Sequence, residues 1–393
     1  MKWVRNEHKK NEIIPREINY FSKKEMKKAY QFHASMPEYA PTPLHALSGL
    51  SESLGTGAIY VKDESKRFGL HAFKGLGASY AMASYFAEKM SLDLHATDFS
   101  GLMERVKNLP TSTFATVTAG NHGKGVAWAA RLFEQEARVY LPKGASSARQ
   151  QAIQKLGADA FISDFNYDDT VKYVADKAKE NGWILMQDTA WEGYETIPLF
   201  IMQGYTTIVS EITETLKELS LNNITHIILQ AGVGSFAASI AAAFYHLRPD
   251  TYPKLIVVEP ENADCLYQSV LHTAGEPQRV HGDLATMMAG LACGEPNPIG
   301  WDILRSVSDF FFSCDDTISA NGMRLLANPT GGDEKIVSGE SGAVPLGLLH
   351  ELFSNEALQG IKEELELDDS SNILVINTEG DTDPDNYRNI VGE

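Results

Sequence analysis

Residues 61–78 read V-K-D-E-S-K-R-F-G-L-H-A-F-K-G-L-G-A, a polar turn and a lysine that follow a short apolar strand at 58–61. The lysine, Lys74, comes after Phe73 and before Gly75 and Leu76. If its amine is buried there, desolvation lowers its pKa and favours the neutral, nucleophilic form. Such an amine can form a Schiff base with a carbonyl cofactor. The alternative is a surface lysine beside a glycine turn, because lysine is rarely buried unless it is paired.

The length and composition indicate an ordinary soluble globular protein with two domains. The chain has 393 residues, more than one hydrophobic core usually serves, with 43% hydrophobic and 22% charged residues. Its formal net charge is −18. This charge argues against nucleic acid or an anionic membrane as a partner, since both bind a basic face.

No stretch of the sequence predicts a secretory leader or a membrane span. The opening M-K-W-V-R-N-E-H-K-K-N-E is charged throughout, and no apolar run approaches the ~20 residues that a membrane span needs. The three cysteines, Cys265, Cys293 and Cys314, lack metal-ligand spacing, so no metal site is expected. We expect buried thiols in a reducing cytoplasm. A Cys265–Cys293 disulfide is the alternative, and it depends on geometry.

From residue 113 the hydrophobic pattern alternates between strands and helices. The expected strands are 114–117, 137–141, 158–162 and 183–186, and the expected helices are 126–133, 148–156 and 168–180. Such alternation predicts an α/β domain with a mostly parallel sheet flanked by helices. Residues 85–195 are expected to form this small domain, with the polar stretch 91–111 as a connection.

A second series of the same kind surrounds the first. The expected helices are 22–34, 79–88, a long helix over 197–219, and 236–245, and the expected strands are 58–61, 225–229, 255–258 and 373–376. Residues 1–84 and 196–393 are therefore expected to form a large, cofactor-binding domain, again with a mostly parallel sheet.

Ligands of open α/β sheets bind at the carboxyl ends of the strands, where this chain has several informative loops. Gly232, Val233, Gly234 and Ser235 follow an expected strand and open a helix. The glycines let backbone N–H groups approach an anion, and the helix N-terminus adds partial positive charge. This loop therefore predicts a phosphate site.

The same loop also satisfies a dinucleotide fingerprint. Gly232, Gly234 and Ala237 have the required spacing, and Glu259 ends the next strand about where a ribose-binding acid belongs. A nicotinamide-dependent oxidoreductase is therefore the competing hypothesis. It leaves Lys74 and the loop 118–123 without a purpose.

The loop 118–123 reads T-A-G-N-H-G and precedes a helix. Thr118, Ala119 and His122 are candidates for binding a substrate carboxylate, and Asn121 could donate to a phenolic oxygen of a ring. A histidine such as His122, taken alone, is more often structural. Asp188, at the end of another expected strand, is either a polar contact of the site or a turn cap.

The lysine stretch, the Asn-Gly loop and the glycine cup occur in the order typical of the fold-type II (tryptophan synthase β-like) pyridoxal-phosphate enzymes. The resemblance starts at residue 41 and extends to 378. Longer segments resemble the diaminopropionate ammonia-lyases: K-D-E-S-K-R-F-G-L-x-A-F-K (62–74), Q-D-T-A-W-E-G-Y (187–194), M-A-G-L-A-C-G-E-P-N-P (288–298), S-G-E-S-G-A (338–343) and T-E-G-D-T-D (378–383).

This resemblance implies a role for each candidate residue. Lys74 would carry pyridoxal 5'-phosphate as a Schiff base and later remove the Cα proton. The phosphate would lie on Gly232, Val233, Gly234 and Ser235, the ring hydroxyl on Asn121 and the pyridine nitrogen on Thr378. Asp188 is the candidate for binding the second amine of the substrate, and Glu340 is a weaker one.

The implied reaction is the α,β-elimination of 2,3-diaminopropionate to pyruvate and two molecules of ammonia, by a cytoplasmic carbon–nitrogen lyase that is a homodimer, as is usual in the family. A serine/threonine dehydratase or a β-replacement enzyme of the same fold is the alternative. One position departs from the family pattern T-D-G-N-H-G, because Ala119 stands where the aspartate is expected. The departure predicts selectivity for the L-isomer.

Overall fold

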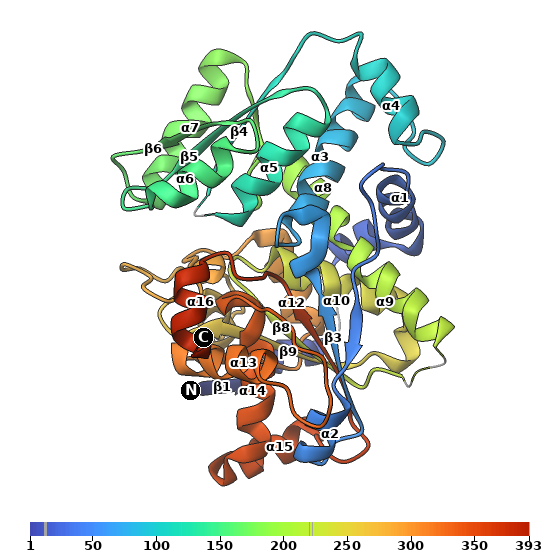
Figure 1. Cartoon of the computed structure of the whole chain (residues 1–393), viewed down its shortest axis with the longest axis vertical. Helices are drawn as coiled ribbons and strands as arrows, with labels where there is room; N and C mark the ends of the chain where they lie inside the picture. The colour runs from blue at the N-terminus through green and yellow to red at the C-terminus, as the bar shows by residue number, and fades with distance from the viewer. Residues whose placement is uncertain (12–13, 119, 220, 222, 393) are drawn as a thin grey trace. The chain divides into compact units, whose positions relative to one another are not determined.

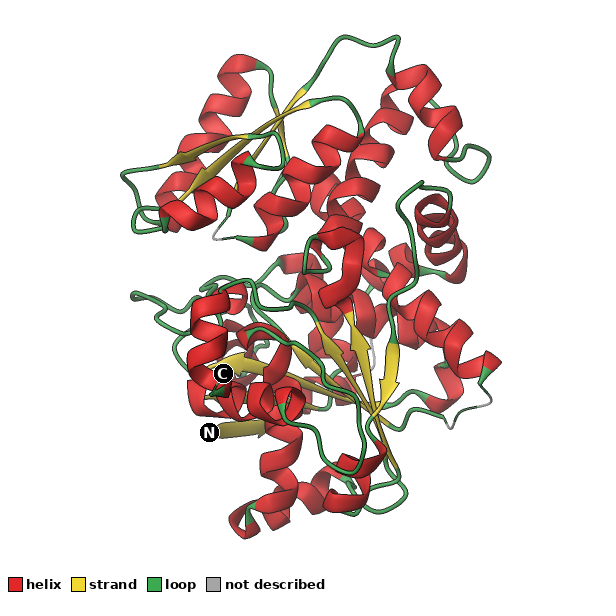
Figure 2. Cartoon of the chain, in the orientation of Figure 1, coloured by secondary structure: helices red, strands yellow, loops and turns green. Residues whose placement is uncertain are grey.

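Two separate β-sheets divide the chain into two units. The computed structural model describes residues 1–11, 14–118, 120–219, 221 and 223–392. The large unit comprises Met1–Ser22, Pro41–Ala72 and Ile208–Glu393, and the small unit comprises Lys23–Ala40 and Phe73–Thr207. Both units are α/β, with helices flanking a mostly parallel sheet (Figures 1 and 2). The predicted fold class is confirmed.

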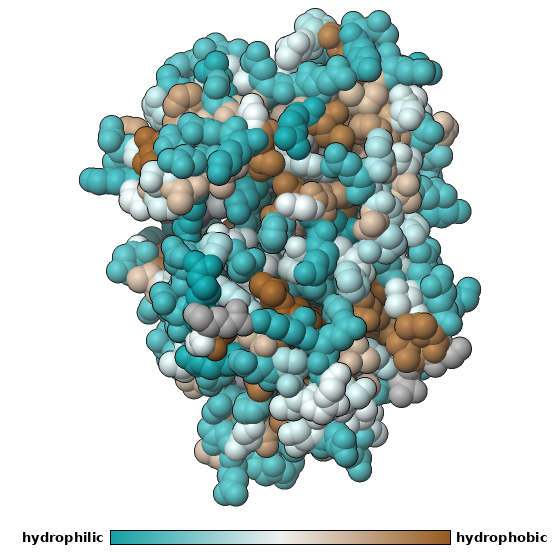
Figure 3. All heavy atoms as spheres, viewed as in Figure 1, coloured by the Kyte–Doolittle hydropathy of each residue, from teal (hydrophilic) through white to brown (hydrophobic). Residues whose placement is uncertain are grey.

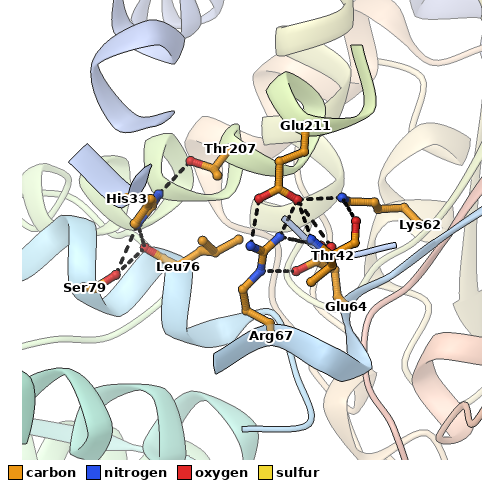
Figure 4. A network of polar contacts seen from close by, with 9 residues as sticks. All are labelled: His33, Thr42, Lys62, Glu64, Arg67, Leu76, Ser79, Thr207 and Glu211. Atoms are coloured by element: carbon orange, nitrogen blue, oxygen red, sulfur yellow. Dashed lines mark hydrogen bonds and ion pairs between the residues drawn. The ribbon is translucent and has the colours of Figure 1, made fainter. Parts of the chain in front are cut away.

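The small unit holds more of the chain than residues 85–195, the predicted small domain. Helices α1 (Lys23–Ala34), α3 (Lys74–Lys89) and α8 (Thr196–Tyr205) pack against one another. His33 of α1 strengthens this packing, because its Nε2 donates to the carbonyl of Leu76 at 3.1 Å (Figure 4). Lys74 therefore belongs to the small unit.

The small unit has a parallel sheet of order β6-β5-β4-β7. Its strands are β4 (Thr113–Val117), β5 (Glu136–Leu141), β6 (Asp159–Ile162) and β7 (Ile184–Leu185). The connecting helices are α5 (Asn121–Leu132), α6 (Ser147–Gln154) and α7 (Tyr167–Asn181). Right-handed crossovers place α5 and α6 on one face and α7 on the other, because the chain reverses its direction across the sheet after β6. All these strands and helices were predicted.

The large unit has a sheet of order β1-β10-β9-β8-β11-β3-β2. Strands β3 (Ala58–Asp63), β8 (His226–Gln230), β9 (Lys254–Pro260), β10 (Phe310–Cys314) and β11 (Asn372–Asn377) are parallel, and β1 (Lys2–Arg5) and β2 (Leu44–Ala46) are antiparallel edges. Every residue of β8 is buried, as expected of a strand covered on both faces. The carboxyl ends of β8 and β11 lie side by side.

Helices of the large unit cover both faces of this sheet. The longer ones are α9 (Thr207–Glu218), α10 (Ser235–Leu247), α12 (Pro298–Val307), α13 (Asp316–Ala327), α14 (Glu340–Ser354) and α16 (Pro384–Val391). The shorter ones are α2 (Ser48–Leu54), α11 (Cys265–Leu271), α15 (Gln359–Leu365), η1 (Glu7–Asn11), η2 (Arg16–Phe21), η3 (Glu64–Gly69), η4 (Pro249–Thr251), η5 (Ala289–Leu291) and η6 (Glu356–Leu358). Helix α10 packs against α12, and α13 packs against α14, which covers β8 and β11. One apolar core joins α13 and α14 to the sheet.

Several segments differ from the sequence prediction. The long helix predicted over 197–219 is two helices, α8 and α9. The interruption lies at Thr206, whose hydroxyl donates to the carbonyl of Gln203 at 2.6 Å and competes with regular helix bonding. The polar connection predicted over 91–111 contains helix α4 (Phe99–Val106), which Asp98 caps. Helix α5 begins at Asn121, earlier than the predicted residue 126.

Hydrophilic residues cover most of the face seen in Figure 3, and hydrophobic side chains appear between them in separate patches. Among the described residues, no helix has the length and apolar character to cross a membrane. Cys265, Cys293 and Cys314 are all in the thiol form, so the Cys265–Cys293 disulfide is not formed.

The polar turn after β3 is buried, because its charges are paired within the large unit (Figure 4). Glu211 of α9 accepts hydrogen bonds from Lys62 Nζ at 2.6 Å and from both terminal nitrogens of Arg67 at 2.8 Å. Arg67 also donates to Glu64, at 2.9 and 2.8 Å. The side chains of all four residues are fully buried, so two acids balance two bases.

Glu211 is expected to stabilise the large unit in a pH-dependent way. Burial opposes its ionisation, but the Arg67 and Lys62 charges outweigh burial and lower the pKa of Glu211 to about 2. Replacing Glu211 with Gln leaves a buried excess of positive charge and should lower the free energy of unfolding by roughly 3–5 kcal/mol at pH 7. Chemical denaturation measures the loss.

A folded pKa below the unfolded value of about 4.3 means that the carboxylate stabilises the fold above that pH. The difference between wild type and Glu211→Gln should therefore shrink as the pH falls from about 4.3 towards 2. Glu218→Gln, at an exposed position of the same helix, is the control and should change stability by less than about 0.5 kcal/mol. An equal effect of both substitutions would contradict the pairing argument.

Candidate active site

Lys74 is the first residue of α3, and its amine faces a carboxylate. Nζ lies 2.5 Å from Oδ2 of Asp188, and the rings of Phe73 and Tyr205 have their centroids 5.1 and 5.8 Å from it. Only 19% of the lysine side chain is exposed. A paired, largely buried amine beside two aromatic rings is not the surface lysine that the sequence left open.

Helix α5 approaches the start of α3 closely enough to require a glycine. A Cβ atom on Gly125 would lie 2.9 Å from the carbonyl carbon and the carbonyl oxygen of Lys74, and both are backbone atoms that cannot move independently. The small residue therefore lets α5 pack against the residue that carries the amine.

Asp188 follows β7 and is held in place by its neighbour, Gln187. The amide oxygen of Gln187 accepts from the Thr116 hydroxyl and the Val117 amide, each at 3.0 Å. Its amide nitrogen donates to the Val117 carbonyl at 3.0 Å and to the Tyr167 hydroxyl at 2.7 Å. Three of these bonds fasten the segment after β7 to the end of β4, and the fourth joins it to the start of α7. No local pattern marks Gln187 for this role, although it begins the motif Q-D-T-A-W-E-G-Y.

The Asp188 carboxyl is ionised at neutral pH. Burial opposes its ionisation, but the neighbouring His122 and Lys74 and the hydrogen bond from Lys74 together hold the pKa of Asp188 well below its usual range. A carboxylate that keeps its charge in this position can hold an ammonium group.

His122 lies beside Asp188 as a buried imidazole. Its Nε2 donates to the Met186 carbonyl at 2.8 Å, and its Nδ1 lies 3.6 Å from Oδ2 of Asp188. Burial and the Lys74 charge lower the pKa of His122, although Asp188 opposes the shift. The ring is therefore neutral at neutral pH, and its proton is on Nε2.

The other candidates of this loop lie around the start of α5. Asn121 is the first residue of the helix, directly after the Gly120 cap. The Thr118 hydroxyl accepts from the Gly120 amide at 3.0 Å, so it is used inside the loop. Ala119 lies outside the described residues.

The glycine cup of the large unit lies at the N-terminus of α10. Gly234 has a φ of +92°, a conformation that favours glycine. Among the described residues, none accepts a hydrogen bond from the backbone amides of Gly232, Val233 or Gly234. On the other side of the loop, Asn297 donates to the Val233 carbonyl at 2.8 Å and to the Ser235 hydroxyl at 2.7 Å. The cup thus combines backbone donors with a helix N-terminus, as an anion requires.

Thr378 follows β11 and is buried. Its hydroxyl accepts a hydrogen bond from Nε2 of Gln230, the last residue of the neighbouring strand β8, at 2.8 Å. A glutamine at a strand end has no distinctive sequence pattern, so Gln230 is not among the predicted site residues.

Two acids of the large unit, Glu340 and Glu259, are buried and already accept hydrogen bonds. Glu340 begins α14, is buried and accepts a hydrogen bond from Asn386, and burial and Glu379 raise its pKa. Both oxygens of the fully buried Glu259 accept from backbone amides of α11, at 2.9 and 2.7 Å. The prediction that Glu259 could bind a ribose is therefore wrong.

Each unit, taken by itself, has its own set of polar groups. The small unit brings an amine, a carboxylate and a neutral imidazole together, and the large unit supplies an anion cup and a buried hydroxyl. Among the described residues, no group of three or more histidine, cysteine or acidic side chains could hold a metal ion.

Comparison with known proteins places the chain in a family. Residues 36–378 match the family described as "Pyridoxal-phosphate dependent enzyme". The chain is 50% identical over 363 residues to the diaminopropionate ammonia-lyase of Salmonella typhimurium, covering 92% of this chain and 90% of the relative.

Solved structures give the same relationship. Diaminopropionate ammonia-lyase from Escherichia coli in complex with an aminoacrylate-PLP azomethine reaction intermediate has a TM-score of 0.90, and the same protein in complex with D-serine has 0.91. Each is 45% identical and covers 99% of this chain and 96% of its own. The chain therefore belongs to the pyridoxal-phosphate dependent enzymes and, among them, to the family of the diaminopropionate ammonia-lyases.

Proposed function

We propose that this chain converts 2,3-diaminopropionate to pyruvate and two molecules of ammonia, with pyridoxal 5'-phosphate as its cofactor. The observation that carries the proposal is the contact of the Lys74 amine with Asp188, in a chain similar to diaminopropionate ammonia-lyases over nine-tenths of its length. A lysine supplies the group that binds and deprotonates an amino acid. A carboxylate supplies the group that recognises a second amine.

The residues of the chain fit this cofactor. The backbone amides of Gly232, Val233 and Gly234, with Ser235, would hold its phosphate, and Lys74 would hold its aldehyde. Thr378 would face its pyridine nitrogen and Asn121 its ring hydroxyl. When bound, the cofactor supplies an electron sink for the charge that develops at Cα.

Lys74 and Asp188 have complementary roles in the proposed reaction. Lys74 removes the Cα proton once its amine is released by the incoming substrate. Asp188, which pairs with the lysine in this structure, then binds the ammonium group at Cβ. Glu340 is a weaker candidate for the same role, because its raised pKa reduces its charge and Asn386 occupies one oxygen. Thr118 and His122 border the substrate region of the small unit.

A homodimer in the cytoplasm is part of the proposal. The family's usual assembly supports the dimer, and three cysteines in the thiol form agree with a reducing compartment.

Lys74 is expected to carry the cofactor covalently. Borohydride reduction of the purified protein, followed by peptide mapping, should place a pyridoxyl group on Lys74. Lys124, in the first turns of α5, is the internal control and should stay unlabelled. A label on another lysine, or tight binding of NAD by a colourless protein, would overturn the assignment.

The substrate preference should depend on Asp188. We expect pyruvate release from 2,3-diaminopropionate to exceed release from serine, threonine or O-acetylserine. Asp188→Asn should raise KM for the diamine by about 10- to 100-fold, the range expected from loss of a charged hydrogen bond. KM for serine should change less, since serine has no second ammonium group.

Glu192→Gln is the matched control, because Glu192 is an exposed acid in the same loop. This substitution should leave KM unchanged for both the diamine and serine. Serine as the clearly preferred substrate of the wild type would make the enzyme a dehydratase, and turnover only in the presence of a second nucleophile would make it a β-replacement enzyme.

Position 119 is expected to set the stereochemistry. Lys74 reaches Cα from one side, and the L- and D-isomers present the Cα proton to opposite sides when their carboxylate and side chain keep the same positions. A second base is then needed for the D-isomer. Asp188 contacts the lysine amine, and His122 lies beside Asp188. We therefore expect both groups on the side of Cα that Lys74 reaches. Ala119 has no ionisable group.

We therefore expect kcat/KM for L-2,3-diaminopropionate to exceed that for the D-isomer by about 10²- to 10⁴-fold, the scale of a missing general base. Ala119→Asp should raise activity on the D-isomer, and Ala119→Asn should not. The Escherichia coli relative was solved in complex with D-serine, so that protein binds a D-amino acid. Comparable kcat/KM values for both isomers in the wild type would refute the argument.

A further inference from the structure

Gln230 ends strand β8 with its side chain buried under the carboxyl edge of the large sheet. Its amide nitrogen donates twice, to the Ile376 carbonyl at 2.9 Å and to the Thr378 hydroxyl at 2.8 Å. Both acceptors belong to β11 or follow it directly, so this one amide spans the end of the neighbouring strand.

The chemistry of the acceptors fixes the orientation of this amide. A backbone carbonyl can only accept, so the atom that faces Ile376 has to be the amide nitrogen. Both of its protons are then used, one for each acceptor. The amide oxygen is buried and has no hydrogen-bond partner among the described residues. In the flipped orientation, the amide oxygen of Gln230 would face the carbonyl oxygen of Ile376 with no proton between them. The Thr378 hydroxyl would then donate to Gln230 instead of accepting from it.

This orientation determines what the Thr378 hydroxyl can do. A hydroxyl has a single proton and accepts through its lone pairs. Because Gln230 donates to it, its own proton points to a different partner, and no described residue accepts it. The hydroxyl is thus prepared to donate to an added acceptor and is not prepared to receive a proton from one.

We propose that Gln230 is a positioning residue that fixes the Thr378 hydroxyl as a hydrogen-bond donor towards the pyridine nitrogen of the cofactor. The inference rests on the proposed function, in which Thr378 faces that nitrogen. A nitrogen that accepts this hydrogen bond uses its lone pair and stays unprotonated. Gln230 therefore sets the electronic state of the cofactor without contacting it.

The backbone at Thr378 is held independently of Gln230. The neighbouring Asn377 donates to Asp63 at 2.8 Å and to the Val337 carbonyl at 3.1 Å, and it accepts from Ser338 at 2.7 Å. Replacing Gln230 is therefore expected to leave Thr378 in place and to free only the rotation of its hydroxyl.

Two substitutions of Gln230 distinguish loss of its hydrogen-bond donor from replacement of that donor by an acceptor. Gln230→Met removes the donor in a side chain of similar size. In Gln230→Glu, a protonated carboxyl would donate its single proton in a hydrogen bond to the Ile376 carbonyl. An ionised carboxyl would have no proton to donate. In either form the introduced oxygen faces Thr378 as an acceptor, so the hydroxyl turns its proton away from the cofactor.

The primary measurement is the ¹⁵N chemical shift of the ring nitrogen in protein loaded with [¹⁵N]pyridoxal phosphate. It does not depend on turnover. In the wild type we expect the shift of an unprotonated nitrogen that accepts a hydrogen bond. Gln230→Glu should move it towards that of a free or a protonated pyridine, and Gln230→Met should move it less. Each variant should lower kcat by about 5- to 10-fold with little change in KM.

A double-mutant cycle tests whether Gln230 acts through Thr378. Thr378→Val should move the ring-nitrogen shift by itself, and adding Gln230→Met should move it no further. Thr378→Ser, which keeps the hydroxyl, should retain the wild-type shift. Gln203→Met, which removes a buried amide of the small unit, is the control for stability and should leave the shift unchanged.

The outcomes distinguish the two levels of inference. Additive effects of the Gln230 and Thr378 substitutions, or a shift that both Gln230 variants leave unaltered, would overturn the role of Gln230 alone. A shift that no Thr378 substitution alters would also overturn it, because the hydroxyl would not face the nitrogen. Failure to load pyridoxal phosphate on Lys74 would overturn the proposed function itself.

Discussion

A charge that leaves water has to be paired, and this constraint governs the motif at 62–74. Its first half inserts Lys62 and Arg67 into the large unit, where Glu211 and Glu64 neutralise them. Its last residue, Lys74, is paired with Asp188 in the small unit. The stretch is polar in sequence and largely buried in the structure for this reason. Losing one partner would leave an uncompensated charge, which costs far more than a surface ion pair contributes.

The sequence predicted the parts of the structure that depend on local patterns. The parallel strands and the candidate Lys74 depend on hydrophobic periodicity and on neighbours along the chain. The partners of the buried charges do not: Glu211 lies 149 positions from Lys62 and has an ordinary helical context. Glu259 illustrates the same limit in reverse. Its position after a strand suggested a ligand contact, and only the fold reveals that α11 uses both of its oxygens.

Helix limits were missed where side chains compete with the backbone. Thr206 interrupts the predicted helix by bonding back to Gln203, and Asn121 begins a helix although asparagine favours turns. The glycines of the anion cup follow a local pattern and could be interpreted from the sequence. The packing role of Gly125 could not, because the close approach of α5 to Lys74 joins residues 51 positions apart in the sequence. The candidate site was therefore predictable as a set of residues, and its hydrogen bonds were not.

Each unit has a buried glutamine at the carboxyl end of a strand that positions a residue of the candidate site. Gln187 satisfies all four of its bonds and fastens the segment that presents Asp188. Gln230 satisfies only its donors and keeps a buried oxygen unpaired. An unpaired buried acceptor costs free energy, so a side chain chosen for stability alone would avoid it. Its retention fits a position at which the direction of one hydrogen bond matters more than complete satisfaction.

The protonation states of the small unit also restrict how the leaving amine can depart. The amine has to leave as neutral ammonia, either by receiving a proton or by leaving from a group that already carries one. Asp188 has no proton to give, since its pKa lies well below its usual range. The neutral His122 has a single ring proton, which the Met186 carbonyl accepts. In the proposed reaction the ammonium group at Cβ therefore brings its own proton, and the Asp188 carboxylate keeps that group charged until the C–N bond breaks.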